Sequence, residues 1–195
     1  YLEYSKDIND SGEHLLHIIN DILDLSKAEA GKLEPVFREI SVKKTIEECI
    51  ELVSRRAGEA GIGIVTEIAP HKPPLVADRV MFKRIMMHLL SNAIKFTNDG
   101  GQITVKADSV KSDDGTTDIF TIEVRDTGIG MSLTDAEIAF KSFVQLDSGL
   151  NRKYDGTGLG LPLSKKFMDL HGGLIRLESE IGKGTTAILT FYSKQ

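Results

Sequence analysis

The sequence contains a single cysteine, Cys49, and no tryptophan. One cysteine excludes an internal disulfide and any metal site built from several cysteines, and it suits a reducing cytoplasm, which is the expected location. No apolar run is long enough to span a membrane, and the N-terminus lacks a signal-peptide pattern. Because the chain starts at Tyr1 instead of Met, we expect a piece of a larger protein, whose other parts can include a membrane anchor.

The chain also lacks an excess of positive charge. Its 24 Lys and Arg residues are outnumbered by 29 Asp and Glu, which gives a net charge of -5. Nucleic-acid binding normally selects a basic surface, so we expect no nucleic-acid partner. A length of 195 residues with 41% hydrophobic composition is sufficient for one well-packed core and an appended element.

The first 30 residues have the apolar spacing of a helix that packs in a bundle. Gly31 and Pro35 then end the pattern, which predicts a boundary between residues 1–34 and residues 35–195. A lone helix with an apolar seam needs a partner, either a second chain or another segment. The apolar positions are Ile8, Leu15, Ile18, Ile19, Ile22 and Leu25.

The remainder alternates between helical and strand patterns, which predicts helices on one side of a mostly antiparallel sheet in an α+β fold. Asp78 is a plausible N-cap of the central helix. A polar segment over 132–156 has little periodicity and is expected to be a lid or binding loop. The expected helices cover residues 41–58, 78–96 and 159–170. The expected strands cover 62–69, 75–77, 102–108, 118–125 and a hairpin over 174–192.

Three polar residues lie on one strip of the central helix. His88, Asn92 and Lys95 are spaced i, i+4 and i+7, beside its apolar face. The amide oxygen of Asn92 suits Mg²⁺, which binds nucleotides through few protein ligands, and Lys95 can neutralise phosphate charge. Taken alone, this strip is more typical of an ordinary polar helix border, and the alternative is one wall of a phosphate-binding cleft.

A carboxylate and two glycines follow the strand expected at 118–125. Asp126 stands at the strand end, and Gly128 and Gly130 come directly after it. A carboxylate there can accept a hydrogen bond from an exocyclic amine such as that of adenine, and glycines let a base approach the backbone. The pattern favours an adenine site, with a plain Asp-Gly turn as the alternative.

Two further glycine-rich segments complete the set. Gly156-Thr157-Gly158-Leu159-Gly160 leads into a helix N-terminus, whose free N–H groups favour phosphate, and Arg152 and Lys153 add positive charge. Gly182-Lys183-Gly184-Thr185 joins two strands and can place the Thr185 hydroxyl near a bound base. Each segment alone is also typical of a hinge or a hairpin turn, but all four in this order predict a nucleotide pocket.

Taken together, these segments resemble the N, G1, F, G2 and G3 boxes of bacterial sensor histidine kinases. Residues 1–34 resemble the second helix of that family's dimerisation and histidine phosphotransfer domain, and residues 35–195 resemble its catalytic, ATP-binding domain. The boxes are Asn92-Ala93-Ile94-Lys95-Phe96, Asp126-Thr127-Gly128-Ile129-Gly130, Phe140-Lys141-Ser142-Phe143, Gly156 to Leu161, and Gly182 to Thr185.

The resemblance implies a two-layer α/β sandwich of the gyrase, Hsp90, histidine kinase and MutL type, preceded by a bundle-forming helix. It implies transfer of the γ-phosphoryl group of ATP to a histidine upstream of this chain, relay to a response regulator receiver domain, and a homodimer formed through the N-terminal helix. It implies Mg²⁺ held by Asn92, phosphate contact by Lys95, and a lid that hinges at residues 156–161. We expect His88, Asn92 and Lys95 to be the catalytic residues, although His88 is not the family's usual residue. The implied nucleotide-binding residues are Asn92, Lys95, Phe96, Asp126, Gly128, Ile129, Gly130, Lys153, Gly156, Thr157, Gly158, Leu159, Gly160, Leu161 and Thr185.

The sequence departs from the family pattern at two places. The acceptor histidine belongs in a His-acidic-x-x-x-Pro setting, which neither His14 nor His17 matches, so we expect this chain not to phosphorylate itself. His88 stands where the N box usually begins with Asn and where ATP-hydrolysing relatives place a general-base Glu. An imidazole there can orient the acceptor or respond to pH, or it can be a tolerated replacement of Asn.

Two other functions fit parts of the sequence. A pseudokinase or allosteric scaffold that binds ATP in a phosphorelay without transferring phosphate fits the replacement at His88. Asp126-Thr127-Gly128 and Asp147-Ser148-Gly149 match the D-[TS]-G motif of aspartic proteases, whose two carboxylates share a proton. An interval of 21 residues is too short to build two protease lobes, and this function leaves the other boxes unexplained.

Overall fold

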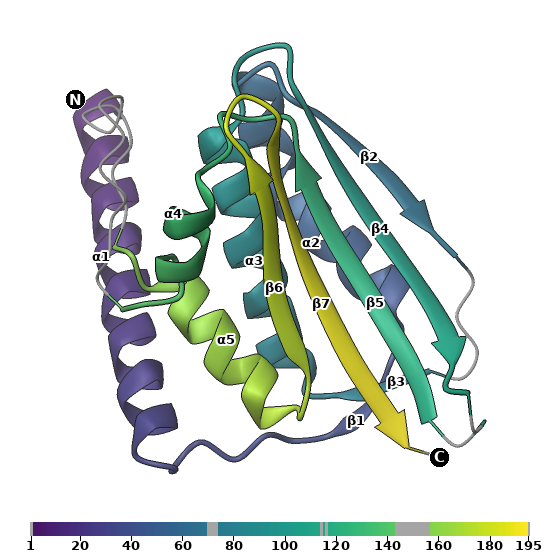
Figure 1. The fold of residues 1–195 in the computed structure, drawn as a ribbon. Coiled ribbons are helices and arrows are strands. Elements are labelled where there is room, and N and C mark those ends of the chain that lie inside the picture. Colours follow the sequence, from purple (N-terminus) through teal and green to yellow (C-terminus); the bar gives the residue numbers. More distant parts are fainter. Residues whose placement is uncertain (1, 70–73, 114, 116, 143–156, 195) are drawn as a thin grey trace.

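The computed structural model describes residues 2–69, 74–113, 115, 117–142 and 157–194. Figure 1 shows a twisted sheet with helices against one of its faces and one long helix, α1, at the side of this layer. The helices are α1 (Leu2–Glu29), α2 (Val42–Glu59), α3 (Arg79–Phe96), α4 (Leu133–Ile138) and α5 (Gly160–Leu170). The strands are β1 (Arg38–Ile40), β2 (Gly63–Ile68), β3 (Leu75–Ala77), β4 (Gln102–Lys111), β5 (Thr117–Asp126), β6 (Leu174–Glu180) and β7 (Gly184–Lys194).

The main sheet has the strand order β2-β4-β5-β7-β6. β2 runs parallel to β4, and each of the other neighbouring pairs is antiparallel. β1 and β3 form a separate antiparallel pair. The helices and the five-stranded sheet confirm the predicted α+β sandwich, and the antiparallel pairing brings the end of β5 beside the start of β7.

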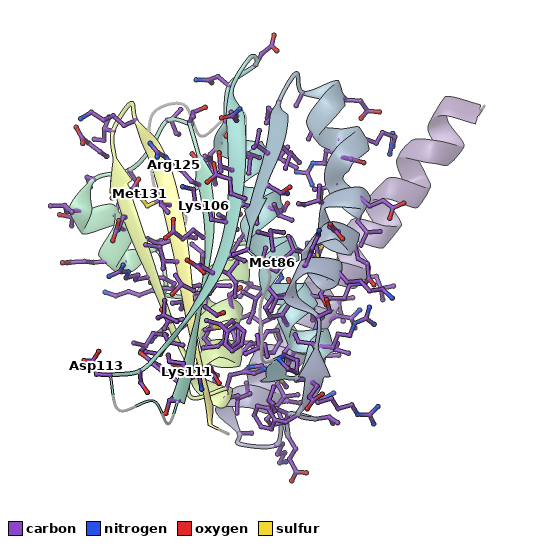
Figure 2. The ribbon with its side chains drawn as sticks, turned by 90° about the vertical axis from the view of Figure 1, so that its right-hand side faces the viewer. Met86, Lys106, Lys111, Asp113, Arg125 and Met131 are labelled. Carbon is purple, nitrogen blue, oxygen red and sulfur yellow. The ribbon has the colours of Figure 1, made fainter. Side chains whose placement is uncertain are left out.

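The core lies between the sheet and the helices because alternate side chains of each strand face the helical layer. In β5, Phe120, Ile122 and Val124 are buried, while the residues between them are more exposed. Figure 2 labels Met86 of α3, which is fully buried in this layer, and Lys106 of β4, which is exposed on the sheet. The strand ends lie at the rim of this core, and the end of β5 carries the polar residue Asp126.

The helix α1 ends as the sequence predicts, and Gly31 adopts a positive φ of 64° just beyond it. Among its described side chains Leu25 alone is buried, whereas Leu15, Leu16 and Leu23 are at least half exposed. The segment after α1 is fixed to the sandwich, because the Val36 N–H donates to Oδ2 of Asp78 at 2.8 Å. Within the described residues, no helix combines the length and the hydrophobicity that crossing a membrane requires.

Two elements were not predicted from the sequence. β1 has only three residues, and its strand conformation depends on pairing with β3, which local patterns do not reveal. α4 lies in the segment predicted as a loop. Its N-cap Ser132 accepts a hydrogen bond from the Asp135 N–H at 3.1 Å and donates to the Asp135 carboxylate, a capping signal that the sequence did contain.

Candidate nucleotide-binding site

Asp126 lies at the end of β5 and is almost fully buried. Its Oδ1 atom accepts two backbone hydrogen bonds, from the Gly128 N–H at 2.8 Å and from the Thr185 N–H at 3.1 Å. Among the residues that the structure describes, no donor reaches Oδ2. The two backbone donors therefore fix the orientation of the carboxylate and leave one oxygen available to a ligand.

Burial raises the pKa of Asp126 above the ordinary aspartate value of 3.8, because desolvation penalises the charged form. The hydrogen bonds from Gly128 and Thr185 act in the opposite direction, since they stabilise the anion. A partly desolvated carboxylate with a free oxygen is a strong acceptor for an N–H donor of a ligand.

The loop after Asp126 is packed tightly against the end of α3. The Ile129 N–H donates to the Phe96 carbonyl oxygen at 3.1 Å, and a Cβ atom at Gly128 would lie 2.2 Å from that oxygen. Gly130 has a φ of 64°, and a Cβ atom there would lie 2.0 Å from the Glu180 carbonyl oxygen. Both glycines are therefore required by close backbone contacts, whereas their approach to a base stays a prediction.

The turn between β6 and β7 lies beside the end of β5 (Figure 1), where Thr185 donates to Asp126. The Ile129 carbonyl accepts from the Gly182 N–H at 2.7 Å. Ser179 accepts from the Met131 N–H at 2.8 Å, and its hydroxyl lies 2.8 Å from that of Thr185. Sequence reasoning missed Ser179, because a lone serine in a strand has no motif that distinguishes it.

Asn92 and Lys95 stand on the last turns of α3, as predicted. Asn92 is half-buried, and its side-chain amide has no hydrogen-bond partner among the described residues. The Lys95 Nζ atom lies 4.8 Å from the centroid of the Phe96 ring. No group of three or more His, Cys, Asp or Glu side chains in the described part of the chain is placed to hold a metal ion. An unpaired amide oxygen with few protein ligands around it fits Mg²⁺ that is bound mainly through phosphates.

The start of α5 carries the described part of the second glycine segment. The Leu159 N–H is 3.3 Å from the Thr157 hydroxyl, and Gly158 has a φ of 68°. Leu159 is buried, and Leu161 is partly buried against the core. The predicted residues Lys153 and Gly156 lie outside the described residues, as do Arg152 and Asp147-Ser148-Gly149.

His88 faces neighbouring helices from the middle of α3. Its Nδ1 atom lies 3.2 Å from the Ser164 hydroxyl on α5, and its Nε2 atom lies 3.5 Å from Oδ2 of Asp21 on α1. The structure thus brings His88 next to α1 and α5, whereas Phe96, Asp126, Gly128, Ile129, Gly130 and Thr185 form one connected cluster. The hydrogen-bonding partners of His88 among the described residues, Asp21 and Ser164, lie outside that cluster, and the catalytic role of His88 stays a prediction.

The sheet also has a shallow hollow of about 320 Å³ on the face of β4 and β5 that is turned away from the helices. Figure 2 places Lys106, one of its lining residues, on that face. None of the predicted nucleotide-binding residues lines it, so we do not assign the site there. The lining residues are Lys106, Asp108, Ser109, Val110, Ile119, Thr121 and Glu123.

The sequence and the structure were compared with those of known proteins, and the comparisons point to the same family. Residues 77–195 match the model of the histidine kinase-, DNA gyrase B- and HSP90-like ATPase family. The chain is 40% identical over 190 residues to the non-motile and phage-resistance protein of Caulobacter vibrioides, which covers 97% of this chain and 22% of that protein. It is 42% identical over 189 residues to hybrid signal transduction histidine kinase B of Dictyostelium discoideum, covering 96% of this chain and 10% of that protein. The chain thus spans less than a quarter of the length of either relative.

Solved structures have the same fold. The crystal structure of full-length ShkA in complex with AMPPNP superposes with a TM-score of 0.81 at 27% identity, over 99% of this chain and 39% of that one. The histidine kinase AdeS of Acinetobacter baumannii superposes with a TM-score of 0.75 at 21% identity, over 95% of this chain and 82% of that one. The chain therefore belongs to the histidine kinase-, DNA gyrase B- and HSP90-like ATPase family and contains the catalytic, ATP-binding domain of a sensor histidine kinase.

Proposed function

We propose that this chain binds magnesium-ATP and transfers the γ-phosphoryl group to a histidine on a segment upstream of residue 1, for relay to a response regulator receiver domain. The observation that carries the proposal is the fixed carboxylate of Asp126. Its Oδ1 is occupied by two backbone donors and its Oδ2 is available, which suits recognition of the exocyclic amine of adenine. The complex of ShkA with AMPPNP supports an adenine nucleotide as the ligand.

The residues that surround Asp126 would shape the base pocket. Gly128, Ile129 and Gly130 are held against the end of α3 and the β6–β7 turn, which gives a rigid wall that requires little reorganisation on binding. The Thr185 hydroxyl stands beside Ser179 at the same place. A preformed wall of backbone and one carboxylate selects a flat, amine-bearing base.

The phosphates would extend from this pocket toward α3 and the N-terminus of α5. Asn92 would hold Mg²⁺ together with phosphate oxygens, and the ion would neutralise negative charge on the transferring group. Lys95 and the N–H groups at the start of α5 would bind the phosphates. In the transfer, the bond from the γ-phosphorus to the bridging oxygen breaks, a bond to an imidazole nitrogen forms, and ADP leaves with the electron pair.

Residues 1–34 would be the second helix of the dimerisation and histidine phosphotransfer domain. The exposed apolar side chains of α1 support this assignment, because a helix with such a face normally packs in a bundle. A second copy of the chain would cover them in a homodimer. These side chains are Leu15, Leu16, Ile19, Ile22 and Leu23.

An ATP-binding scaffold that does not transfer phosphate is the second candidate. Both ring nitrogens of His88 lie near partners, Asp21 and Ser164, in the described structure. A ring held in this way serves packing and orientation better than proton transfer. Binding of ATP would then regulate a phosphorelay partner without chemistry on the nucleotide.

One experiment separates the two candidates. The chain is extended upstream to include an acceptor helix and incubated with radiolabelled ATP and Mg²⁺. Phosphotransfer predicts protein-bound phosphate that is labile in acid and stable in base, as phosphohistidine is. Nucleotide binding without such phosphate would favour the scaffold, and the Asp126→Asn variant serves as the binding-deficient control.

A further inference from the structure

Three helices meet at a polar junction that the proposed function does not use. Asp21 and Asp24 of α1, Arg84 and His88 of α3, and Ser164 of α5 form this group, which we call the three-helix junction. Figure 1 shows α1 running alongside α5 at this part of the molecule. The spacing i, i+3 on α1 and i, i+4 on α3 places the paired residues of each helix on one face.

Arg84 provides the electrostatic part of the junction. Its guanidinium forms an ion pair with the Asp24 carboxylate and lies 3.6 Å from that of Asp21. The carboxylate side chains are only 19% and 15% exposed, so they are shielded more than ordinary surface ion pairs. The guanidinium carbon also lies 5.9 Å from the centroid of the Phe167 ring on α5. Arg84 therefore holds α1 against the sandwich.

His88 has a different position in the junction, because it contacts both neighbouring helices through different atoms. When Nε2 carries the proton it can donate to Asp21, and Nδ1 can then accept from the Ser164 hydroxyl. Ser164 is completely buried on α5. The orientation of the ring thus depends on a partner in α1 and on a partner in α5.

α5 is the helix that follows the glycine segment of the nucleotide site. A Cβ atom at Gly160, its first residue, would lie 3.3 Å from Cγ of His88, so the ring packs directly on the start of α5. Leu159 and Gly158 immediately precede this contact. A change in the orientation of His88 would therefore be felt at the end of α5 that is proposed to bind phosphate.

The attachment of α1 to the sandwich has the character of a reversible contact. Leu25 is the sole described α1 side chain that is buried, and Asp21 and Asp24 make polar contacts with Arg84 and His88 of α3. Small, polar interfaces between domains normally permit relative motion. Docking and release of α1 would add or remove the Asp21 partner of His88.

We propose that His88 is a positioning residue that couples docking of α1 to nucleotide binding at the start of α5. The proposal rests on the proposed function only in that the chain binds an adenine nucleotide. By thermodynamic linkage, a nucleotide that favours the docked position of α1 must bind more tightly when α1 is docked. Loss of either contact of His88 removes the coupling.

Two substitutions test the Nδ1 and Nε2 contacts of His88 separately. His88→Asn keeps a polar atom near the position of Nδ1, toward Ser164, but does not reach Asp21. His88→Gln keeps a polar atom near the position of Nε2, toward Asp21, but lacks the group toward Ser164. Asp24→Asn is the matched control, because it weakens the docking contact with Arg84 without touching His88.

Docking is measured by the distance between spin labels on cysteines introduced at Leu16 of α1 and Thr66 of β2, which are both exposed. Labelled protein is diluted with unlabelled chain, and Cys49 is left in place because it is buried. Spectra are recorded with and without Mg-AMPPNP, and nucleotide affinity is measured by calorimetry. Typical coupling energies predict that nucleotide shifts the docking equilibrium of the wild type about five-fold or more.

The proposal predicts that this shift is lost in both His88→Asn and His88→Gln. In Asp24→Asn the docked fraction falls, but nucleotide changes it by the same factor as in the wild type. An unchanged shift in either His88 variant, or no shift in the wild type, would overturn the proposal. Phosphoryl transfer enters neither measurement, so an absence of transfer with intact coupling would count against the proposed function alone.

Discussion

Asp126 and Thr185 are 59 positions apart in the sequence, and the Thr185 N–H donates to Oδ1 of Asp126 at 3.1 Å. The contact exists because β5 and β7 are antiparallel neighbours, which brings the end of β5 to the start of β7. Gly184 is essential to this approach, since its φ is 97° and a Cβ atom there would lie 2.0 Å from the Asp126 carbonyl oxygen. The glycine segment that begins at Asp126 and the turn segment that ends at Thr185, which were predicted as separate motifs, are therefore in direct contact.

The Gly128→Ala variant tests the close packing of the first glycine segment. The added Cβ atom would lie 2.2 Å from the Phe96 carbonyl oxygen, so either the loop or α3 must move. Overpacking of this kind costs about 1–3 kcal/mol, and we predict a loss of this size in unfolding free energy measured with urea. Gly63→Ala, which meets no atom within 4 Å, is the control. Equal stability of the two variants would be inconsistent with the observed contact.

The Asn92→Ala variant tests the proposed magnesium ligand. Removal of the amide oxygen should leave nucleotide affinity the same with Mg²⁺ and with EDTA, whereas the wild type should bind more tightly with Mg²⁺. Affinity is measured by calorimetry with AMPPNP. Asn20→Ala on α1 removes an exposed amide of the same kind and should titrate like the wild type. A magnesium effect of full size in Asn92→Ala would exclude this ligand.

His171 makes folding stability sensitive to acid. Its Nδ1 lies 2.6 Å from the Phe167 carbonyl oxygen, and the Asp78 N–H donates to Nε2 at 3.0 Å, which requires a neutral ring. Burial lowers the pKa of His171 below its ordinary value of 6.5, although the contacts with Phe167 and Asp78 act in the opposite direction. The unfolded chain therefore takes up this proton first as the pH falls.

The contribution of His171 is consequently present above about pH 6.5 and is lost as the pH falls through the lowered folded pKa. We predict that the unfolding free energy of the wild type decreases on acidification in this window. In His171→Gln the decrease should be smaller, because the titrating group is absent. Urea unfolding at a series of pH values measures both slopes, and parallel slopes would argue against this role.

Cys49 should be unreactive in the folded protein. The thiol is fully buried between α2 and α3, and burial raises its pKa to about 11, so thiolate is scarce at neutral pH. We predict that Ellman's reagent reacts slowly with native protein and rapidly in guanidinium chloride. Rapid reaction under native conditions would show that α2 opens readily. Slow reaction also permits selective labelling of cysteines introduced at the surface.

The sequence was most informative where local chemistry decides the structure. The N-cap at Asp78, the positive φ at Gly31 and the alternation in β5 were predictable, since each depends on neighbouring residues. Contacts set by tertiary structure were not predictable. The pairing of β1 with β3 and the junction of His88 with Asp21 and Ser164 join distant segments whose own patterns carry no sign of the partner.

In the candidate site, too, the types of residue were predictable from the sequence, but their contacts were not. The carboxylate and the glycines were identifiable as types of residue suited to a nucleotide, but the sequence could not assign Oδ1 of Asp126 to two backbone donors and leave Oδ2 available. His88 was predicted to lie on a strip with Asn92 and Lys95. All three residues do lie on α3, but the sequence could not show that the His88 ring contacts Asp21 and Ser164, because these partners lie on other helices.

Calorimetric titration of Asp126→Asn with Mg-ADP tests the central claim most directly. The Asn side chain can still accept from Gly128 and Thr185 through its oxygen, but its amide group replaces the free oxygen and opposes the adenine amine. Loss of a charged hydrogen bond costs about 1.5–3 kcal/mol, so we predict roughly 10- to 150-fold weaker binding. Asp118→Asn, a buried carboxylate at the other end of β5, should bind like the wild type. Wild-type affinity in Asp126→Asn would contradict the account.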